Sequence, residues 1–366
     1  MSQKDSNISW KVTLAPVLLA AISLLLRWAV PADWIEQVYS RGIFPVFRTV
    51  WDALITSWFP IPLLYVFWAL VIFGIVQWIR GTIRRKRSKG WGSALVFAAS
   101  RLVQFVAWVV VAFLWLWGFN YGRQSVEEVL DFRRYSPDSV ALASYVYNEA
   151  QSLAALRKTI IADSSVAFSH SDLPADWMTI TRQMLEDALA QEGYPTTGKV
   201  RIRQLWPKGI LLRFSTAGVY WPWVGEGNAD GGLTALQLPG VVAHEMAHGY
   251  GFGDEGTCNF WSVLTGFQAT DPALEYVFRL DYWRRMAGRL RRAQPRQYFA
   301  WRQHSLYQGI KTDLEHIYTN SQKYPDIMPR FRTAFYDTYL RTQGISEGIL
   351  SYGLVIQMVE GYKRRE

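Results

Sequence analysis

The sequence predicts an α+β protein in which three N-terminal transmembrane helices precede a mostly helical domain that contains a small β-sheet. Long uncharged apolar runs are confined to the first third of the 366 residues, and helical periodicity dominates the rest. A few short alternating segments lie between two helical regions, which is typical of the α+β class. We therefore expect a membrane region over residues 1–120 and an extracytoplasmic domain over residues 121–366.

Three apolar segments are long enough to cross a membrane, and we expect them at about residues 12–30, 61–79 and 102–119. The 19 residues from 61 to 79 carry no charge, and a transmembrane helix needs roughly 20 such residues. Tryptophans lie near the ends of the three segments, where indole rings favour the headgroup region. A cleavable signal peptide is an alternative for the first segment, but the two later spans would keep the protein in the membrane.

Positive charge is concentrated between the second and third apolar segments. Six Lys and Arg residues lie between Arg80 and Lys89 without an acidic residue, and without them the net charge falls from +9 to +3. The positive-inside rule places this run in the cytoplasm, so the N-terminus is cytoplasmic and the C-terminal domain is extracytoplasmic. Residues 31–60 then form a translocated loop. Because the excess charge has this topological explanation, we expect no nucleic-acid binding.

The C-terminal domain is expected to begin with helices over residues 138–162 and 174–191. Short strands are predicted over residues 199–205, 209–215 and 232–238, and mainly helices follow Pro239. The apolar stretch 349–359 is too short to cross a membrane, so it is expected to be a packed or membrane-surface helix. Cys258 is the only cysteine, which excludes an intrachain disulfide.

The strongest motif in the chain is His244-Glu245-Met246-Ala247-His248. Histidines four residues apart project from the same face of a helix, and Pro239 suits the first turn of such a helix. Two imidazoles at this spacing can bind one Zn²⁺, and the intervening Glu245 can act as the general base toward a water that the metal activates. The motif is typical of zinc metallopeptidases.

The third zinc ligand has two candidates in the sequence. Asp254 occupies the last position of a metzincin-type HExxHxxGxx(H/D) pattern, with Gly251 at the turn. Glu255 begins a segment that is similar to the ligand helix of gluzincins, in which Asn259 would orient a ligating histidine. If Asp254 instead caps that helix, Glu255 lies in its first turn. The sequence favours His244, His248 and Glu255 as the zinc ligands, with Asp254 as the alternative third ligand.

Several segments, together with this motif, resemble a bacterial membrane-protein family known as domain of unknown function 3810. The resemblance runs nearly end to end and includes Glu36–Pro45, Trp117–Gly122, Gly218–Pro222, His244–Phe260, Phe278–Tyr282 and Gly348–Gly353. In that family an acid-rich segment close to Glu-Asp-Glu-Ala-Asn follows the second histidine. Aligned on Asn259, its first Glu falls on Glu255, whereas its next two acids fall on Gly256 and Thr257. The resemblance implies a zincin-type peptidase of the bacterial cytoplasmic (inner) membrane and leaves its substrates open.

The predicted function is a membrane-anchored, gluzincin-like zinc peptidase whose partners are the lipid bilayer and exported or membrane-proximal peptides or proteins. Gly218–Gly225 is either an edge strand that pairs with an extended substrate or a segment whose aromatic residues Tyr220, Trp221 and Trp223 are in the core or face the membrane. Tyr282 is a weaker candidate for stabilising the oxyanion. One alternative function is an inactive pseudopeptidase that acts as a membrane scaffold or chaperone. Another is hydrolysis of a different amide, such as one in the cell wall.

Overall fold

The computed structural model describes residues 4–56, 58–327, 338, 342 and 353–365, without the side chains of residues 4–13 and 56. The chain divides into two compact units. The first comprises Met1–Arg123 and Trp221–Glu226, and the second comprises Gln124–Tyr220 and Gly227–Glu366. The short segment Trp221–Glu226 therefore belongs with the N-terminal part of the chain, about 100 residues before it. The sequence did not predict this.

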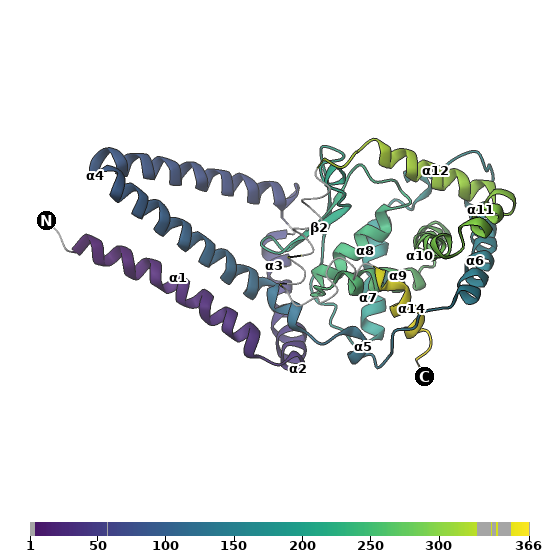
Figure 1. Ribbon diagram of the computed structural model, residues 1–366, viewed down its shortest axis with the longest axis horizontal. Coiled ribbons are helices and arrows are strands. Elements are labelled where there is room, and N and C mark those ends of the chain that lie inside the picture. The colour runs from purple at the N-terminus through teal and green to yellow at the C-terminus, as the bar shows by residue number, and fades with distance from the viewer. Residues whose placement is uncertain (1–3, 57, 328–337, 339–341, 343–352, 366) are drawn as a thin grey trace. The chain divides into compact units, whose positions relative to one another are not determined.

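The first unit is built from two long helices, α1 (Lys4–Ala29) and α4 (Leu63–Leu116), which Figure 1 shows in purple and blue. They are joined by a bent helical segment, and a 3₁₀ turn follows α4; these elements are α2 (Ala32–Trp34), η1 (Ile35–Ile43), α3 (Phe44–Trp51), η2 (Asp52–Thr56) and η3 (Gly118–Gly122). Helix α1 packs on α4 through Ala20, Ala107 and Val111. Small side chains at such a contact let two helices approach closely.

Helix α4 consists of two arms that meet at Gly90. Gly90 has φ 78° and ψ 177°, a conformation that glycine adopts without the penalty that a Cβ brings. The chain turns back on itself there (Figure 1). The guanidinium of Arg85 lies 5.2 Å from the ring centre of Phe97, so the arms run side by side near the turn. The basic run Arg80–Lys89 is thus helical, and the extended loop expected between two spans is reduced to a break at one glycine.

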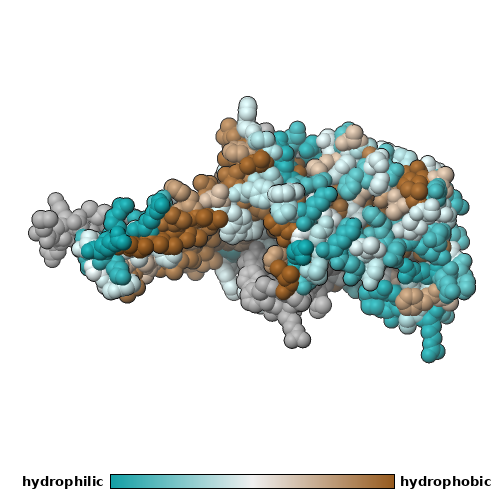
Figure 2. Space-filling view, turned by 90° about the horizontal axis from the view of Figure 1, so that it is seen from above, coloured by the Kyte–Doolittle hydropathy of each residue, from teal (hydrophilic) through white to brown (hydrophobic). Residues whose placement is uncertain are grey.

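Helix α4 is, among the described residues, the one helix that is long and apolar enough to cross a membrane. Residues 14–29 of α1 and residues 32–55, bent by 108°, pass the same test together and would make a second such segment. Three separate spans were predicted, and the structure supports the coarser statement that one or two segments can cross. Hydrophobic surface covers the arms of α4, and hydrophilic residues gather at the end where the basic run lies (Figure 2).

The second unit is mostly helical with a three-stranded sheet, as expected for the α+β class. The helices before the sheet are α5 (Val126–Val129), α6 (Ser139–Ile160) and α7 (Trp177–Gln191), with a 3₁₀ turn η4 (His170–Asp172). The sheet has the order β1-β3-β2, and β1 (Ile202–Leu205) pairs in parallel with β3 (Glu226–Asp230), which leaves β2 (Gly218–Trp221) at an edge. The helices after the sheet are α8 (Leu238–Gly249), α9 (Glu255–Phe267), α10 (Pro272–Ala293), α11 (Pro295–His304), α12 (Gln308–Gln322) and α14 (Val355–Tyr362).

Two of the predicted strands are wrong. Residues 209–215 contain the 3₁₀ turn η5 (Leu212–Phe214), and residues 232–238 form turns that lead into α8. The buried carboxylate of Asp230 accounts for both, because it accepts hydrogen bonds from the backbone N–H groups of Gly209, Leu211, Leu212 and Gly232. These donors bond to a side chain instead of a neighbouring strand. Residues 349–352 of the apolar stretch 349–359 lie outside the described residues. Its residues 355–359 belong to α14, and their apolar side chains are buried in the core, so this part is a packed helix.

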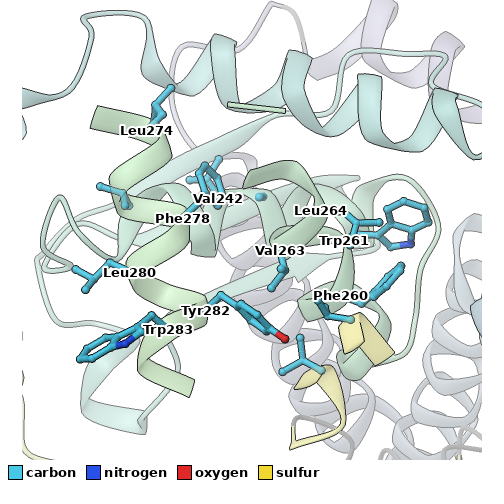
Figure 3. Packing of buried hydrophobic residues seen from close by; sticks show 14 of the residues in the cluster. Val242, Phe260, Trp261, Val263, Leu264, Leu274, Phe278, Leu280, Tyr282 and Trp283 are labelled. Atoms are coloured by element: carbon cyan, nitrogen blue, oxygen red, sulfur yellow. The ribbon is translucent and has the colours of Figure 1, made fainter. Parts of the chain in front are cut away.

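The core of the second unit surrounds α8, which contacts α7, α9 and α10. Val242 of α8, Trp261 and Leu264 of α9 and Phe278 of α10 belong to one hydrophobic cluster (Figure 3). All of these side chains are buried. Burying large apolar side chains is the main stabilising contribution in such a unit. The helix that carries the His-Glu-x-x-His motif is therefore held by packing on several sides.

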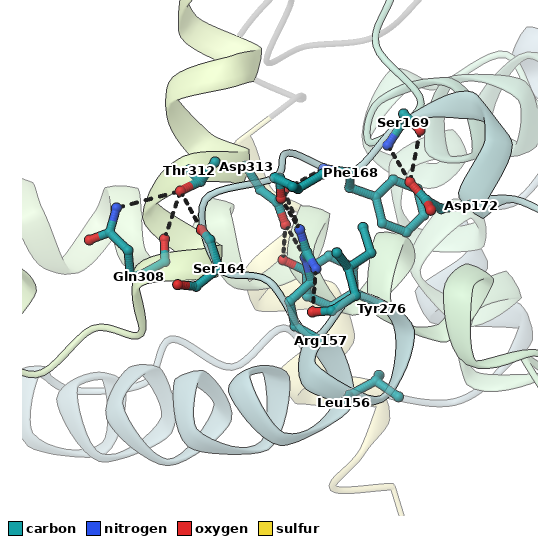
Figure 4. Close-up of polar contacts among 12 residues, drawn as sticks. Leu156, Arg157, Ser164, Phe168, Ser169, Asp172, Tyr276, Gln308, Thr312 and Asp313 are labelled. Atoms are coloured by element: carbon teal, nitrogen blue, oxygen red, sulfur yellow. Dashed lines mark hydrogen bonds and ion pairs between the residues drawn. The ribbon is translucent and has the colours of Figure 1, made fainter.

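A buried ion pair joins three helices of the second unit. The Nε of Arg157 on α6 lies 2.7 Å from the Oδ2 of Asp313 on α12, and both side chains have no exposed surface. Asp313 also accepts hydrogen bonds from the hydroxyl of Tyr276 on α10 and from the N–H of Phe168 (Figure 4). Arg157 donates to the carbonyls of Ile161 and Val166. The pair is thus desolvated but surrounded by partners, which is the condition under which a buried ion pair is tolerated.

Replacing Arg157 with Ala is expected to lower the free energy of unfolding by about 3–5 kcal/mol, because it leaves the Asp313 carboxylate buried without its counterion. The matched control is Arg182→Ala, which removes a partly exposed contact of 3.7 Å with Glu186. That loss should stay below about 1 kcal/mol. Urea unfolding in detergent micelles, followed by circular dichroism, measures both. Equal small losses would contradict the role given to the Arg157–Asp313 pair.

Candidate metal centre

Helix α8 places the two motif histidines side by side. The helix begins at Leu238 with Pro239 in its first turn, and the motif occupies its C-terminal half. The ring centroids of His244 and His248 lie 4.9 Å apart at an interplanar angle of 82°. The spacing of four residues on one helix produces this arrangement directly.

Glu255 joins the histidines, and Asp254 does not. The Oε2 atom of Glu255 lies 3.0 Å from the Nε2 of His244 and 3.5 Å from the Nε2 of His248. One ligand atom from each of these three residues lies within 4.8 Å of the others. Asp254 is the N-cap of α9, where its Oδ1 accepts a hydrogen bond of 2.7 Å from the N–H of Thr257. Gly251, at φ 92°, lies in the turn that brings the chain from α8 to the start of α9.

The residues present fit a zinc ion. Zinc with tetrahedral bonds of about 2.0–2.1 Å separates its nitrogen and oxygen ligands by roughly 3.3 Å. The two nitrogen–oxygen distances at Glu255, 3.0 Å and 3.5 Å, lie on either side of that value. Two histidines and one glutamate are also a donor set found in catalytic zinc sites, in which the fourth position is left to water or substrate.

The second ring nitrogen of His248 has a partner that orients the ring. Its Nδ1 lies 2.7 Å from the carbonyl oxygen of Phe252. When His248 is neutral, as a metal ligand has to be, an Nδ1–H that donates to this carbonyl leaves the lone pair on Nε2, the atom that faces Glu255. Such contacts are usual behind metal-binding histidines. The Sγ of Cys258 lies 3.2 Å from the same Nδ1. Burial raises the pKa of the Cys258 thiol to about 12, so this side chain is neutral.

The cluster is strongly polarised. Burial alone would raise the pKa of Glu255, but the imidazoles of His248 and His244 hold it well below its usual range. Burial would likewise lower the pKa of His248, and Cys258 and Glu255 beside it raise it well above its usual value. A carboxylate that stays ionised between two imidazoles is an arrangement that a divalent cation stabilises.

Glu245 is a buried carboxylate beside the cluster. Glu245 is only 5% exposed. Burial raises the pKa of Glu245, and the nearby His244 and His248 oppose that rise. The backbone N–H of Tyr220 donates to the carboxylate, whereas the Oε2 atom has no hydrogen-bond partner among the described residues. A buried polar atom without a partner is rare and indicates a functional role or an unobserved partner.

Two glycines allow the β2–β3 hairpin to lie directly on Glu245. A Cβ atom on Gly218 of β2 would lie 2.6 Å from the Oε1 of Glu245, and one on Gly227 of β3 would lie 3.2 Å from its Cβ. The sequence singled out Gly218–Gly225 as a candidate edge strand, and β2 does lie at the edge of the sheet. It did not connect either glycine with Glu245, although glycine within a strand often marks a close backbone approach.

Other residues considered from the sequence lie elsewhere. The hydroxyl of Tyr282 donates to Glu360 on α14 at 2.9 Å, so it is engaged away from the histidines. Asn259 donates to the backbone carbonyl of Glu255 at 2.8 Å and not to a ligating histidine. Asp281 on α10 was missed. It lies close enough to His244 for their charges to interact, and the Phe278–Tyr282 segment was the signal that could have pointed to it.

Fold and site thus define an α+β protein with apolar helices able to cross a membrane and a His-His-Glu cluster on two adjacent helices. The chain matches the family described as "Protein of unknown function (DUF3810)" over residues 39–359 and belongs to that family, which confirms the resemblance seen in the sequence. Searches of the curated proteins and of the solved structures found no significant match. The family description names no activity, so a function has to be argued from the site.

Zinc content should separate the two candidate third ligands. Wild type purified without chelator is expected to carry about one zinc per chain, and the folded variants His244→Ala and Glu255→Gln should lose it because each removes a ligand. Asp254→Ala should keep the zinc and lose about 1 kcal/mol of stability as the helix cap disappears. Plasma mass spectrometry and urea unfolding measure the two effects. Zinc loss in Asp254→Ala alone would reverse the assignment.

Proposed function

We propose that this protein is a membrane-anchored zinc-dependent peptidase in which His244, His248 and Glu255 hold the metal and Glu245 is the general base. The observation that carries the proposal is the position of the Glu255 Oε2, 3.0 Å and 3.5 Å from the two histidines of a His-Glu-x-x-His helix. Zinc bound there would supply a Lewis acid that polarises the scissile carbonyl and makes water more acidic.

Glu245 is suited to move the proton that the reaction must transfer. A water adds its oxygen to the carbonyl carbon, and its proton passes to the Glu245 carboxylate. The carbon–nitrogen bond then breaks, and Glu245 delivers the proton to the leaving amine. A buried carboxylate whose pKa is raised holds a proton between these two transfers more readily than an exposed one. Its unpaired Oε2 is the atom assigned to this role.

The edge strand β2 is the proposed binding place for the substrate. An extended peptide that adds to an exposed edge gains affinity from main-chain hydrogen bonds, which every peptide can form. The backbone of β2 lies against Glu245 at Gly218, so a peptide paired there would lie beside the general base. The substrate class is therefore an extended segment of an exported or membrane-proximal protein.

The proposed topology has three spans, namely α1 and the two arms of α4. A straight helix of the 54 residues of α4 would be about 81 Å long, whereas the hydrocarbon core is only about 30 Å thick. The break at Gly90 divides it into two arms of suitable length. The basic run Arg80–Lys89 would then lie at a cytoplasmic turn, with the N-terminus on the same side and the second unit outside the cytoplasm of a bacterial inner membrane.

Reporter fusions test this topology. Alkaline phosphatase is active only outside the cytoplasm, so a fusion at the C-terminus should be active and a sandwich fusion at Lys86 should be inactive. Green fluorescent protein at the same two positions should show the opposite pattern. The physical reason is the energetic preference for Arg and Lys on the cytoplasmic side. Equal activity at both positions would rule the topology out.

Glu245→Gln tests the peptidase. The variant should keep its fold and its zinc, because the amide is nearly isosteric and Glu245 is not a ligand, and it should lose about 10²–10⁴-fold in hydrolysis. Full-length protein in lipid vesicles with a library of quenched-fluorescent peptides provides the assay, and Asp254→Ala serves as the variant that should remain active. Zinc-loaded wild type that cleaves nothing, with a Glu245→Gln variant that complements a deletion strain fully, would favour the scaffold or chaperone alternative.

A further inference from the structure

The bent segment between α1 and α4 buries its charged side chains and exposes its apolar ones, which is the reverse of a helix at an aqueous surface. From Trp34 to Leu54 the chain holds four charged residues, Glu36, Arg41, Arg48 and Asp52. Three of them are buried, and the side chain of Arg41 is only 20% exposed. A helix at an aqueous surface directs its charged residues outward and its apolar residues inward.

The outward face of the same segment is apolar. Its large side chains are between 38% and 70% exposed: Trp34, Val38, Ile43, Val46, Phe47, Val50 and Leu54. The remaining exposed residues from Trp34 to Leu54 are Gln37, Gly42, Thr49 and Ala53, so no charged residue is fully exposed on this face. Contiguous apolar surface of this kind marks a place where a protein meets another apolar phase or partner.

The inward polar groups form ion pairs and hydrogen bonds within the first unit. Glu36 forms ion pairs of 2.7 Å with Arg41 and 2.6 Å with Arg123. Arg48 pairs with Asp52 at 2.8 Å, and the hydroxyl of Ser40 donates to Asn120 at 2.8 Å. Desolvating ion pairs is unfavourable beside available water. Turning them inward is favourable when the outer side is hydrocarbon, where an exposed charge is even less stable.

We propose that the segment Trp34–Leu54 lies in the lipid bilayer, along its interface, with this apolar face against the acyl chains. The 108° bend between residues 14–29 and 32–55 prevents the segment from continuing the direction of α1. A helix bent by this angle from a span near the bilayer normal runs close to the plane of the membrane. The neighbouring elements α1 and α4 also expose apolar side chains, such as Leu25 and Phe73. All three elements thus present apolar surface to the proposed lipid phase. Residues 31–60 are then no aqueous loop.

The inward face of this segment also holds the tip of the β2–β3 hairpin. The Nε1 of Trp51 donates to the carbonyl of Val224 at 2.8 Å, and Arg48 donates to the carbonyl of Gly225. The carboxylate of Glu226 accepts from the N–H of Leu63 at the start of α4. The bilayer-embedded segment therefore anchors the turn from which β2 and β3 extend.

Nitroxide labels on single cysteines test the lipid contact in full-length protein reconstituted into phosphatidylcholine–phosphatidylglycerol vesicles. The native Cys258 is buried, so introduced cysteines can be labelled selectively. Labels at Val46→Cys and Val50→Cys should collide with oxygen, which partitions into lipid, and not with a water-soluble nickel complex. Phe73→Cys on α4 is the lipid-facing control, and Val140→Cys on α6, 75% exposed, is the water-facing control.

Two outcomes overturn the proposal. Access of the nickel complex to Val46 and Val50, as at Val140, would place the face in water. Protection from both reagents would mean that protein covers it, such as a second copy of this chain, which crosslinking would detect. As a second measurement, Val46→Lys should lower the thermal midpoint in vesicles whereas Val140→Lys should not, and equal midpoints would contradict lipid contact.

The proposal rests on the membrane anchoring in the proposed function but not on the zinc chemistry. A failed peptidase assay leaves the label accessibilities unchanged. If the anchoring itself is wrong, the Phe73 label becomes accessible to the nickel complex as well. A water-accessible Val46 beside a lipid-facing Phe73 would overturn only the interfacial placement.

Discussion

The organisation of the second unit depends on a small set of buried polar atoms that must find partners among themselves. His248 and Glu255 are nearly inaccessible to water, and the helices that carry them, α8 and α9, contribute to the apolar core of the unit. Each polar atom left unpaired in such a place is destabilising. The turn at Gly251 and the cap at Asp254 start α9 where Glu255 meets both imidazoles. The way α9 packs on α8 therefore also sets the geometry of the cluster.

Buried charge is handled in two ways in this protein. In the second unit Arg157 and Asp313 form a pair whose neighbouring donors and acceptors are all provided by adjacent elements. At the candidate metal centre the charges are not balanced so completely, since the Oε2 of Glu245 keeps no partner within the described residues. The first arrangement serves stability. The second leaves one buried carboxylate oxygen without a hydrogen bond, and the proposed role of Glu245 as general base uses this atom.

The side chains of the first unit are arranged as expected for a protein surrounded by hydrocarbon. Its bent segment turns Glu36, Arg48 and Asp52 inward and Val46 and Leu54 outward, which is favourable against hydrocarbon and unfavourable against water. The same segment holds Val224 and Gly225 at the hairpin tip. The strands leading from that tip carry Gly218 and Gly227, which pack on Glu245. In the proposed membrane placement, the segment that faces the lipid also holds the tip of the hairpin.

Features of the fold and of the candidate site that depend on residues close together in the sequence could be predicted, and features that depend on distant residues could not. The pairing of His244 with His248 was readable because a spacing of four residues is a local property of a helix. The sequence favoured Glu255 over Asp254 but did not decide between them, since adjacent residues reach the same region. The hydrogen bond from Thr257 to Asp254 decides which one is left for the histidines. Strand β3 was missed because Glu226, Asn228 and Asp230 are typical of turns, yet all are buried.

The apolar runs and the basic stretch Arg80–Lys89 by themselves determined that part of this chain suits a membrane, because composition over about 20 residues reflects the solvent. The role of residues 32–55 needed tertiary structure. Their charges balance one another in the sequence as they would in an aqueous loop, and only the fold pairs Glu36 with Arg123 and Ser40 with Asn120. Partners about 80 residues apart cannot be found from local periodicity. The sequence determined which residues are of a type that could bind a metal or face a membrane, and the tertiary structure decided which of them lie together, because burial and pairing depend on the whole fold.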